Sequence, residues 1–139
     1  HVLPNDAVLL ERNGEQIVIA GIEDPLMGQD VEQSIDQAMQ NINKDLFTIL
    51  LSHRPEQFEA YVKKDIDLVM TGHAHGGQIR VPFIGGLVAP SQGMMPKYSA
   101  GIFEEQQTKM VVNRGLGNSL FPYRILNLPE IYVIQLNKK

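Results

Sequence analysis

The sequence predicts an α/β fold with mixed parallel and antiparallel strands. Two mainly apolar runs, residues 47–51 and 66–70, are each followed within three residues by a histidine, and a helical segment separates them. A strand, a helix and a strand of this length form a βαβ unit, so the two strands are expected to be parallel neighbours. Further strand-like segments follow between residues 98 and 136. This order favours two packed sheets with helices outside, a four-layer α/β/β/α sandwich of which the chain supplies the second half.

The first elements are expected to be a hairpin and a helix. Residues 7–12 and 15–20 are β-prone, and Asn13-Gly14 between them is typical of a type I′ turn. Asp30, with Gln33 three residues later, resembles a capping box that opens a helix. Apolar residues then recur at helical spacing and should face the core. They are Val31, Ile35, Ala38, Met39 and Ile42.

The next segments have the pattern of the βαβ unit. The run 47–51 is apolar apart from Thr48, as expected of a strand buried on both faces. Pro55 suits the first turn of a helix, which is expected to bury Phe58, Tyr61 and Val62. Beyond the second run we expect a short strand at 78–81, a long loop at 85–97, and an antiparallel region. Its strands are expected at 98–103, 109–113 and 131–136.

The composition is that of one soluble globular domain. The 139 residues are 43% hydrophobic and 20% charged, and no apolar run approaches the roughly 20 residues that span a bilayer. A net charge of −4 argues against a nucleic-acid surface, because phosphate backbones are held mainly by Lys and Arg. There are no cysteines, so disulfides, thiolate zinc sites and cysteine nucleophiles are excluded. A metal ion would need His, carboxylate, Asn or backbone oxygen as ligands.

Three of the four histidines follow expected strands. His53 and His73 come just after the ends of two parallel strands, and such ends share one edge of a sheet, with neighbours about 4.8 Å apart. If residues 73–75 are extended, His73 and His75 point the same way and can bind two metal ions roughly 3.5–4 Å apart. The glycines around this pair allow close approach of the backbone to a ligand. The alternative is that each histidine is an ordinary hydrogen-bonded or solvated residue.

Two motifs resemble those of a known family. Residues 51–56, Leu-Ser-His-Arg-Pro-Glu, and residues 71–78, Thr-Gly-His-Ala-His-Gly-Gly-Gln, are similar to the two late metal motifs of calcineurin-like metallophosphoesterases. The order, the spacing and the buried strand before each motif match that family. Residues 113–117, 122–124 and 129–130 are similar to its bacterial branch that is often anchored to membranes. The resemblance spans most of the chain, and it implies membrane association for the complete protein.

The resemblance implies a ligand role for each histidine. His53 and His73 would bind one divalent ion and His75 the other, and imidazole suits manganese, iron and zinc alike. The family's early motifs, Asp-x-His, Gly-Asp-x-x-Asp and Gly-Asn-His followed by an acid, do not occur in this sequence. These motifs supply the bridging carboxylate, the Asn ligand and the histidine that protonates the leaving group. Residues 1–139 are therefore expected to be the C-terminal part of a domain whose N-terminal part is absent.

Without a bridging carboxylate, two cations held close together repel each other strongly. Partial or no metal occupancy is therefore expected in this chain. Asp24 and Asp67 are the nearest substitutes in the sequence. Asp67 begins its strand, at the wrong end for the site. Asp24 can reach the rim, but it is expected to cap the turn before Pro25.

Several polar residues are candidates for substrate binding. Arg54 and Arg114 can clamp a phosphate, because guanidinium makes bidentate contacts with phosphoryl oxygens. Arg80 and Arg124 are weaker candidates of the same kind. Gln78 can orient substrate or a ligand histidine. The alternative for the arginines is a surface salt bridge or a contact with backbone carbonyls.

Together these features predict a metal-dependent phosphoesterase, in which a hydroxide bridging two metals attacks phosphorus in line. The expected partners are a phosphate-ester substrate and the N-terminal half of the domain, and this chain alone is expected to be inactive. One alternative is a non-catalytic scaffold or binding module with the same fold. Another is a mononuclear zinc site built on three histidines.

Overall fold

The computed structural model describes residues 1–25, 28–119 and 122–137. Its main element is a six-stranded sheet in the order β1-β2-β3-β4-β10-β9. The central strands β2, β3, β4 and β10 are parallel to one another, and the edge strands β1 and β9 are antiparallel to their neighbours. The prediction of an α/β fold with mixed strand directions is confirmed. The strands are β1 (Asp6–Arg12), β2 (Glu15–Gly21), β3 (Thr48–Leu51), β4 (Leu68–Thr71), β9 (Gly101–Glu105) and β10 (Thr108–Val112).

The local signals in the first half of the chain produce the expected elements. Arg12 pairs with Glu15 across the Asn13-Gly14 turn, and both turn residues have positive φ. Asp30 caps helix α1 (Val31–Ala38) by accepting a hydrogen bond from the backbone N–H of Gln33. The helix is shorter than its apolar pattern, because Met39 forms its C-cap.

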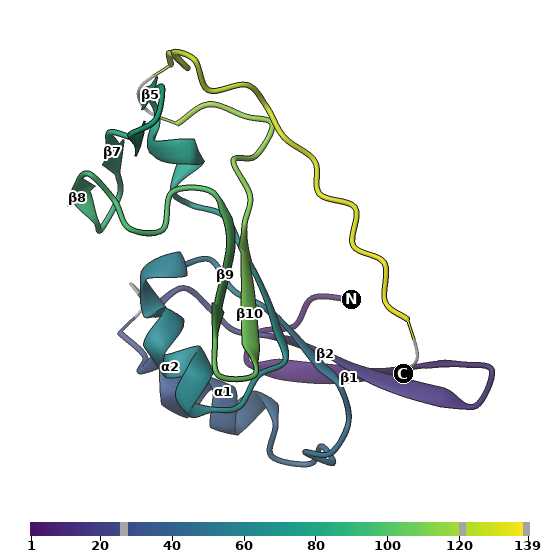
Figure 1. The fold of residues 1–139 in the computed structure, drawn as a ribbon. Coiled ribbons are helices and arrows are strands. Elements are labelled where there is room, and N and C mark those ends of the chain that lie inside the picture. Colours follow the sequence, from purple (N-terminus) through teal and green to yellow (C-terminus); the bar gives the residue numbers. More distant parts are fainter. Residues whose placement is uncertain (26–27, 120–121, 138–139) are drawn as a thin grey trace.

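The βαβ unit is also present. The 3-10 helix η2 (Pro55–Gln57) leads into helix α2 (Phe58–Lys63), between the parallel neighbours β3 and β4. Helices α1 and α2 lie side by side on one face of the sheet (Figure 1). Alternate residues of the central strands pack against them and are almost fully buried. These are Val18, Ala20, Leu50, Val69, Met110 and Val112.

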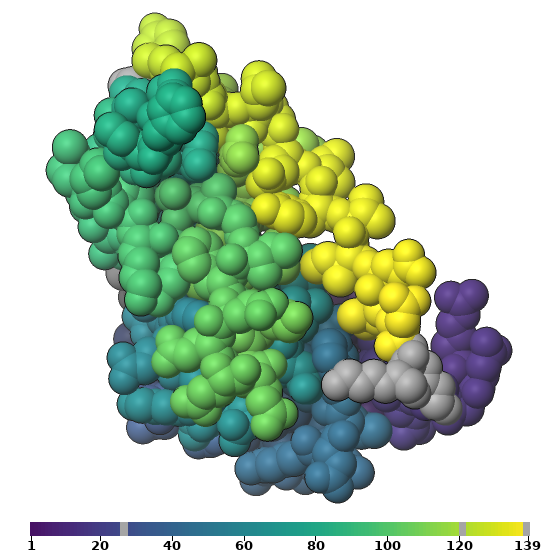
Figure 2. Space-filling view, viewed as in Figure 1, coloured from purple at the N-terminus to yellow at the C-terminus, as the bar shows by residue number. Residues whose placement is uncertain are grey.

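The opposite face of the sheet is apolar but less well covered. Ile49, Leu68 and Val111 are buried there, together with partly buried residues that include Tyr132. Nearer the strand ends, Leu51 is 42% exposed and Met70 is 36% exposed. Residues 122–137 run along the outside of the molecule (yellow in Figures 1 and 2). The predicted strand at 131–136 is wrong, since these residues join no ladder in the structure.

The remaining short elements gather beyond one edge of the sheet (Figure 1). The predicted loop at 85–97 instead contains three short strands: β7 pairs with β8, and β6 pairs with β5, which falls within the strand predicted at 78–81. The strands expected from residue 98 onward do not begin another sheet, because β9 and β10 extend the main one. No helix in the described parts of the chain is long and apolar enough to cross a membrane. The short elements are η3 (His75–Gly77), β5 (Arg80–Val81), β6 (Gly85–Gly86), β7 (Val88–Ala89) and β8 (Gly93–Met94).

Candidate metal centre at the carboxyl edge of the sheet

The four parallel strands end at the same edge, and each is followed by a polar residue. Asp24 follows β2, His53 follows β3, His73 follows β4 and Arg114 follows β10. Backbone hydrogen bonds extend past the strand ends, with Ser52 donating to Met70 over 3.1 Å and Asn113 donating to Thr71 over 2.9 Å. This parallel pairing places residues from distant parts of the sequence at one rim.

His53 and His73 are in direct contact. Their ring centroids lie 4.2 Å apart with the ring planes tilted by 50°. Asp24 is beside them, with its Oδ2 atom 3.6 Å from Nε2 of His53. The expected meeting of His53 and His73 is therefore observed, and Asp24 reaches the rim.

The segment from His73 to His75 is not extended. His73 has a φ of 60° and His75 a φ of 47°, and His75 begins the 3-10 helix η3. Positive φ is uncommon for residues other than glycine and places them in the left-handed region. The condition under which His73 and His75 would point the same way is therefore not met. Side chains two residues apart point to the same side only where the backbone is extended, and this turn is not extended.

Asn127 holds this turn in place. It is 2% exposed, and its Nδ2 atom donates to the carbonyl of His75 over 2.6 Å and to that of Gln78 over 3.2 Å. Gly76 lies against the same side chain, and a Cβ atom there would be 2.2 Å from Oδ1 of Asn127. Asn127 was not among the predicted site residues, although a lone amide between Leu126 and Leu128 is a usable signal.

The environment favours neutral imidazole at two of the histidines. Burial, followed by the charges of His53 and Arg54, lowers the pKa of His73. Burial also lowers the pKa of His75, and the positive charge of Arg124 adds to this effect. Neutral imidazole is the form that binds metal ions. In addition, Nε2 of His73 is buried and has no hydrogen-bond partner among the described residues.

Arg54 organises the loop after β3. Its Nε donates to Oδ1 of Asp24 over 2.7 Å, and its Nη1 donates to Glu56 and to Ser91. Only 5% of the side chain is exposed. The hydroxyl of Tyr61 donates to the Arg54 carbonyl over 2.7 Å. In this conformation the guanidinium faces protein partners, so it supports the position of His53 and is not open to a substrate.

The other predicted substrate-binding residues lie in the same region. Arg114 is partly exposed, and its Nε is 3.6 Å from Oε1 of Glu130. Gln78 donates to Oγ of Ser119 over 2.6 Å. Arg124 donates to four backbone carbonyls, which matches the structural alternative considered for it. The acceptors are Arg114, Gly115, Gly117 and Asn127.

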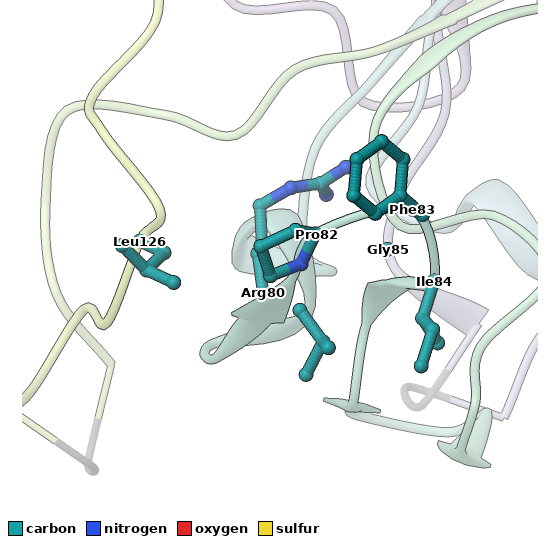
Figure 3. Close-up of a pocket in the computed structure, with 7 residues that line it drawn as sticks. Arg80, Pro82, Phe83, Ile84, Gly85 and Leu126 are labelled. Carbon is teal, nitrogen blue, oxygen red and sulfur yellow. The ribbon is translucent and has the colours of Figure 1, made fainter.

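Arg80 donates to the carbonyl of Gly76 over 2.9 Å. It also lines an open hollow of about 460 Å³ between the β5–β6 turn and Leu126 (Figure 3). Phe83 in that turn is fully exposed. None of the predicted histidine ligands lines this hollow, so it is distinct from the histidine rim.

The residues present fit part of a metal site. His53 and His73 offer imidazole nitrogens, one of them unpartnered, and Asp24 adds a negative charge. Across the described ranges, however, no three His, Asp or Glu side chains are arranged to hold an ion by themselves. The donor set therefore suits metal ions only when further ligands are added.

Comparison with known proteins finds similarity to metallophosphoesterases. The chain is 36% identical over 125 residues to an uncharacterized metallophosphoesterase, YkuE, of Bacillus subtilis, which covers 89% of this chain and 42% of the relative. It is 30% identical over 135 residues to the phosphodiesterase YaeI of Escherichia coli, covering 97% of this chain and 47% of the relative. It is 33% identical over 105 residues to the UDP-2,3-diacylglucosamine pyrophosphatase LpxG of Chlamydia muridarum, covering 71% and 32%.

No family model and no solved structure matches the chain. The chain spans less than half the length of these curated relatives. A mixed α/β sheet with paired histidines after its parallel strands is the kind of site that metal-dependent hydrolases use. The chain belongs to the calcineurin-like metallophosphoesterase family.

Proposed function

We propose that this chain is the C-terminal part of a metal-dependent phosphoesterase, and that His53, His73 and His75 are its metal ligands. The observation that carries the proposal is the pairing of His53 with His73, whose rings are 4.2 Å apart. The buried Nε2 of His73 has no partner among the described residues, although most buried polar atoms in proteins have one. The names of the relatives support phosphate-ester hydrolysis as the reaction.

The other residues of the rim have supporting roles. Divalent ions such as manganese, iron or zinc polarise a phosphoryl oxygen and activate water in enzymes of this kind. Asp24 offsets positive charge beside His53, and Arg54 holds both Asp24 and the loop after β3. Arg114, which follows the neighbouring strand β10, would attract the substrate phosphate through its guanidinium. Asn127 fixes the turn that carries His75.

We also propose that the complete domain is the four-layer sandwich, with its other sheet and the remaining ligands supplied by a segment outside this sequence. The less covered face of the sheet supports this arrangement. Leu51 and Met70 are partly exposed there although they lie on central strands. Packing a second sheet about 10 Å away would bury this apolar surface.

Metal titration tests the ligand assignment. The protein, extended by the segment that completes its domain, is expected to bind two Mn²⁺ or Zn²⁺ ions and to hydrolyse a p-nitrophenyl phosphodiester. His53→Gln, His73→Gln and His75→Gln should each weaken calorimetric binding by at least about tenfold, whereas His1→Gln, at an exposed residue outside the histidine rim, should change nothing. Unchanged affinity in the His73→Gln protein would remove this residue from the ligand set.

The same experiment addresses the alternatives. The partial donor set favours the non-catalytic scaffold as the second candidate function. That reading predicts fewer than two bound ions and no hydrolysis even in the extended protein. One tightly bound zinc, with activity of this chain alone, would instead indicate the mononuclear site.

A further inference from the structure

An apolar cavity of about 540 Å³ lies next to the histidine turn. Its volume is within the roughly 300–1,000 Å³ typical of small-molecule sites. One wall is formed by the residues that follow His75, and the other by strands β7 and β8. Apolar groups dominate the lining, and the polar groups are the side chains of Gln78 and Ser119, which are hydrogen-bonded to each other. The lining residues are Gly77, Gln78, Ile79, Leu87, Val88, Ala89, Pro90, Met94 and Ser119.

Both walls are bonded to the candidate metal centre. The backbone N–H of Leu87 reaches the carbonyls of Gly77 and Ile79, at 3.2 Å and 2.9 Å, which joins the β7 wall to the histidine turn. Ser91, in the turn between β7 and β8, accepts a hydrogen bond from Arg54. Arg54 in turn binds Asp24 beside His53. The cavity and the histidine rim are therefore parts of one connected structure.

The residues that line this cavity include no acidic side chain, although the chain carries a net charge of −4. No Asp or Glu occurs between Asp67 and Glu104, or between Glu105 and Glu130. These stretches form β4, η3 and β5 to β8, and they continue through β10 into the loops that follow it. The cations outside the sheet in these stretches are Arg80, Lys97, Arg114 and Arg124. One of these cations, Arg114, pairs with Glu130.

We propose that this cavity binds the alkyl chain of an anionic amphiphile, so that the substrate of the phosphoesterase is a phosphate ester with an apolar tail. Such a molecule has an apolar end that suits the cavity and a phosphate end that suits the histidine rim to which the cavity is connected. The cavity removes methylene groups from water, and Arg80, which directly follows the lining residue Ile79, attracts the phosphate. The inference extends the proposed function, since it assigns a substrate class to the same rim.

Binding of alkyl phosphates to the protein tests this proposal. The probes are ethyl, butyl, hexyl and octyl phosphate, each kept below its micelle concentration, with affinity measured by calorimetry. Each added methylene is expected to tighten binding by about two- to fourfold. Affinity that does not rise from ethyl to octyl phosphate would overturn the proposal.

Two neighbouring methionines provide matched variants. Met94 lines the cavity and Met95 does not, and they are 71% and 57% exposed. Met94→Glu places a charge against the alkyl chain and should weaken octyl phosphate binding by at least about tenfold. Met95→Glu adds the same charge outside the cavity and should weaken it by about twofold. Equal losses would show that charge alone matters, and would count against the cavity.

The probe experiment is independent of the metal centre. It is performed in the presence of chelator, and it measures binding and not hydrolysis. Loss of metal binding in a histidine variant therefore leaves the chain-length dependence unchanged if the cavity proposal is right. A flat chain-length series together with intact metal binding would reject the tail-binding cavity and retain the proposed phosphoesterase.

Discussion

Arg54 and Asp24 form an ion pair that joins the ends of two parallel strands. Nε of Arg54 lies 2.7 Å from Oδ1 of Asp24, and Nη2 lies 3.3 Å from Oδ2. The arginine side chain is 5% exposed and that of the aspartate is 31% exposed. The pair raises the pKa of Arg54, with the hydrogen bond to Asp24 as the largest cause. It therefore fixes the loop that carries His53.

Asp24→Asn is expected to destabilise the protein. The substitution leaves the buried guanidinium with Glu56 and Ser91 as its remaining partners, so the free energy of unfolding should fall by about 1–3 kcal/mol. Urea denaturation measures this change. The matched control is Asp36→Asn, because Asp36 makes an exposed ion pair with Lys64, and its loss should cost less than about 1 kcal/mol. Equal effects would contradict a buried role for the Arg54–Asp24 pair.

The turn after His75 requires glycine at position 76. Position 72, which precedes both histidines, has room for a larger residue. Gly76 has a φ of 66°, and a Cβ atom there would be 2.2 Å from Oδ1 of Asn127. Gly76→Ala should therefore cost about 1–3 kcal/mol of stability. At Gly72 the nearest atom to a new Cβ would be 4.0 Å away. Gly72→Ala should change stability by about 0.5 kcal/mol or less.

Thermal denaturation of the two variants gives this comparison directly. The NMR signal of the His75 ring provides a second readout, and it should shift in Gly76→Ala because the turn moves away from Asn127. A Gly76→Ala protein as stable as Gly72→Ala would mean that the Asn127 contact does not constrain the turn.

Much of the scaffold was predictable because its signals are local. The Asn13-Gly14 turn, the Asp30 cap and the two apolar runs before the histidines each encode their element within a few residues. Parallel pairing then brings His53 and His73 together without further information. By contrast, residues 131–136 have strand-like composition but no partner strand in the structure, since composition does not show where a ladder partner lies.

The contacts that complete the rim were less predictable. Asp24 meets Arg54 across 30 residues of sequence, and Asn127 meets His75 across 52. Such pairs depend on how whole segments fold back on each other, which periodicity does not encode. The backbone at His73 and His75 was also missed, because left-handed residues next to glycine break the alternation on which the prediction of their direction relied.

Tyr61 gives the chain a pH-dependent stability that can be measured apart from metal binding. The side chain is fully buried, its hydroxyl donates to the Arg54 carbonyl over 2.7 Å, and it lies 2.7 Å from Oγ of Ser52. Burial raises the pKa of Tyr61 well above its ordinary value of 10.0. Above pH 10 the unfolded chain therefore loses a proton that the folded chain keeps. Stability falls as the pH rises, by up to about 1.4 kcal/mol per pH unit from this group.

Tyr61→Phe removes that dependence. At pH 7 the variant should be less stable than the wild type by about 0.5–1.5 kcal/mol, because the hydrogen bond to Arg54 is lost. Between pH 10 and 11.5 the difference should shrink, since the wild type alone loses the stability that the proton confers. Urea unfolding across this range measures the two curves, and lysine titration cancels between them. Tyr123→Phe, at a position that is 65% exposed, is the matched control and should run parallel to the wild type. Parallel curves for Tyr61→Phe as well would mean that the hydroxyl ionises with equal ease in the folded protein, contrary to its burial against Arg54.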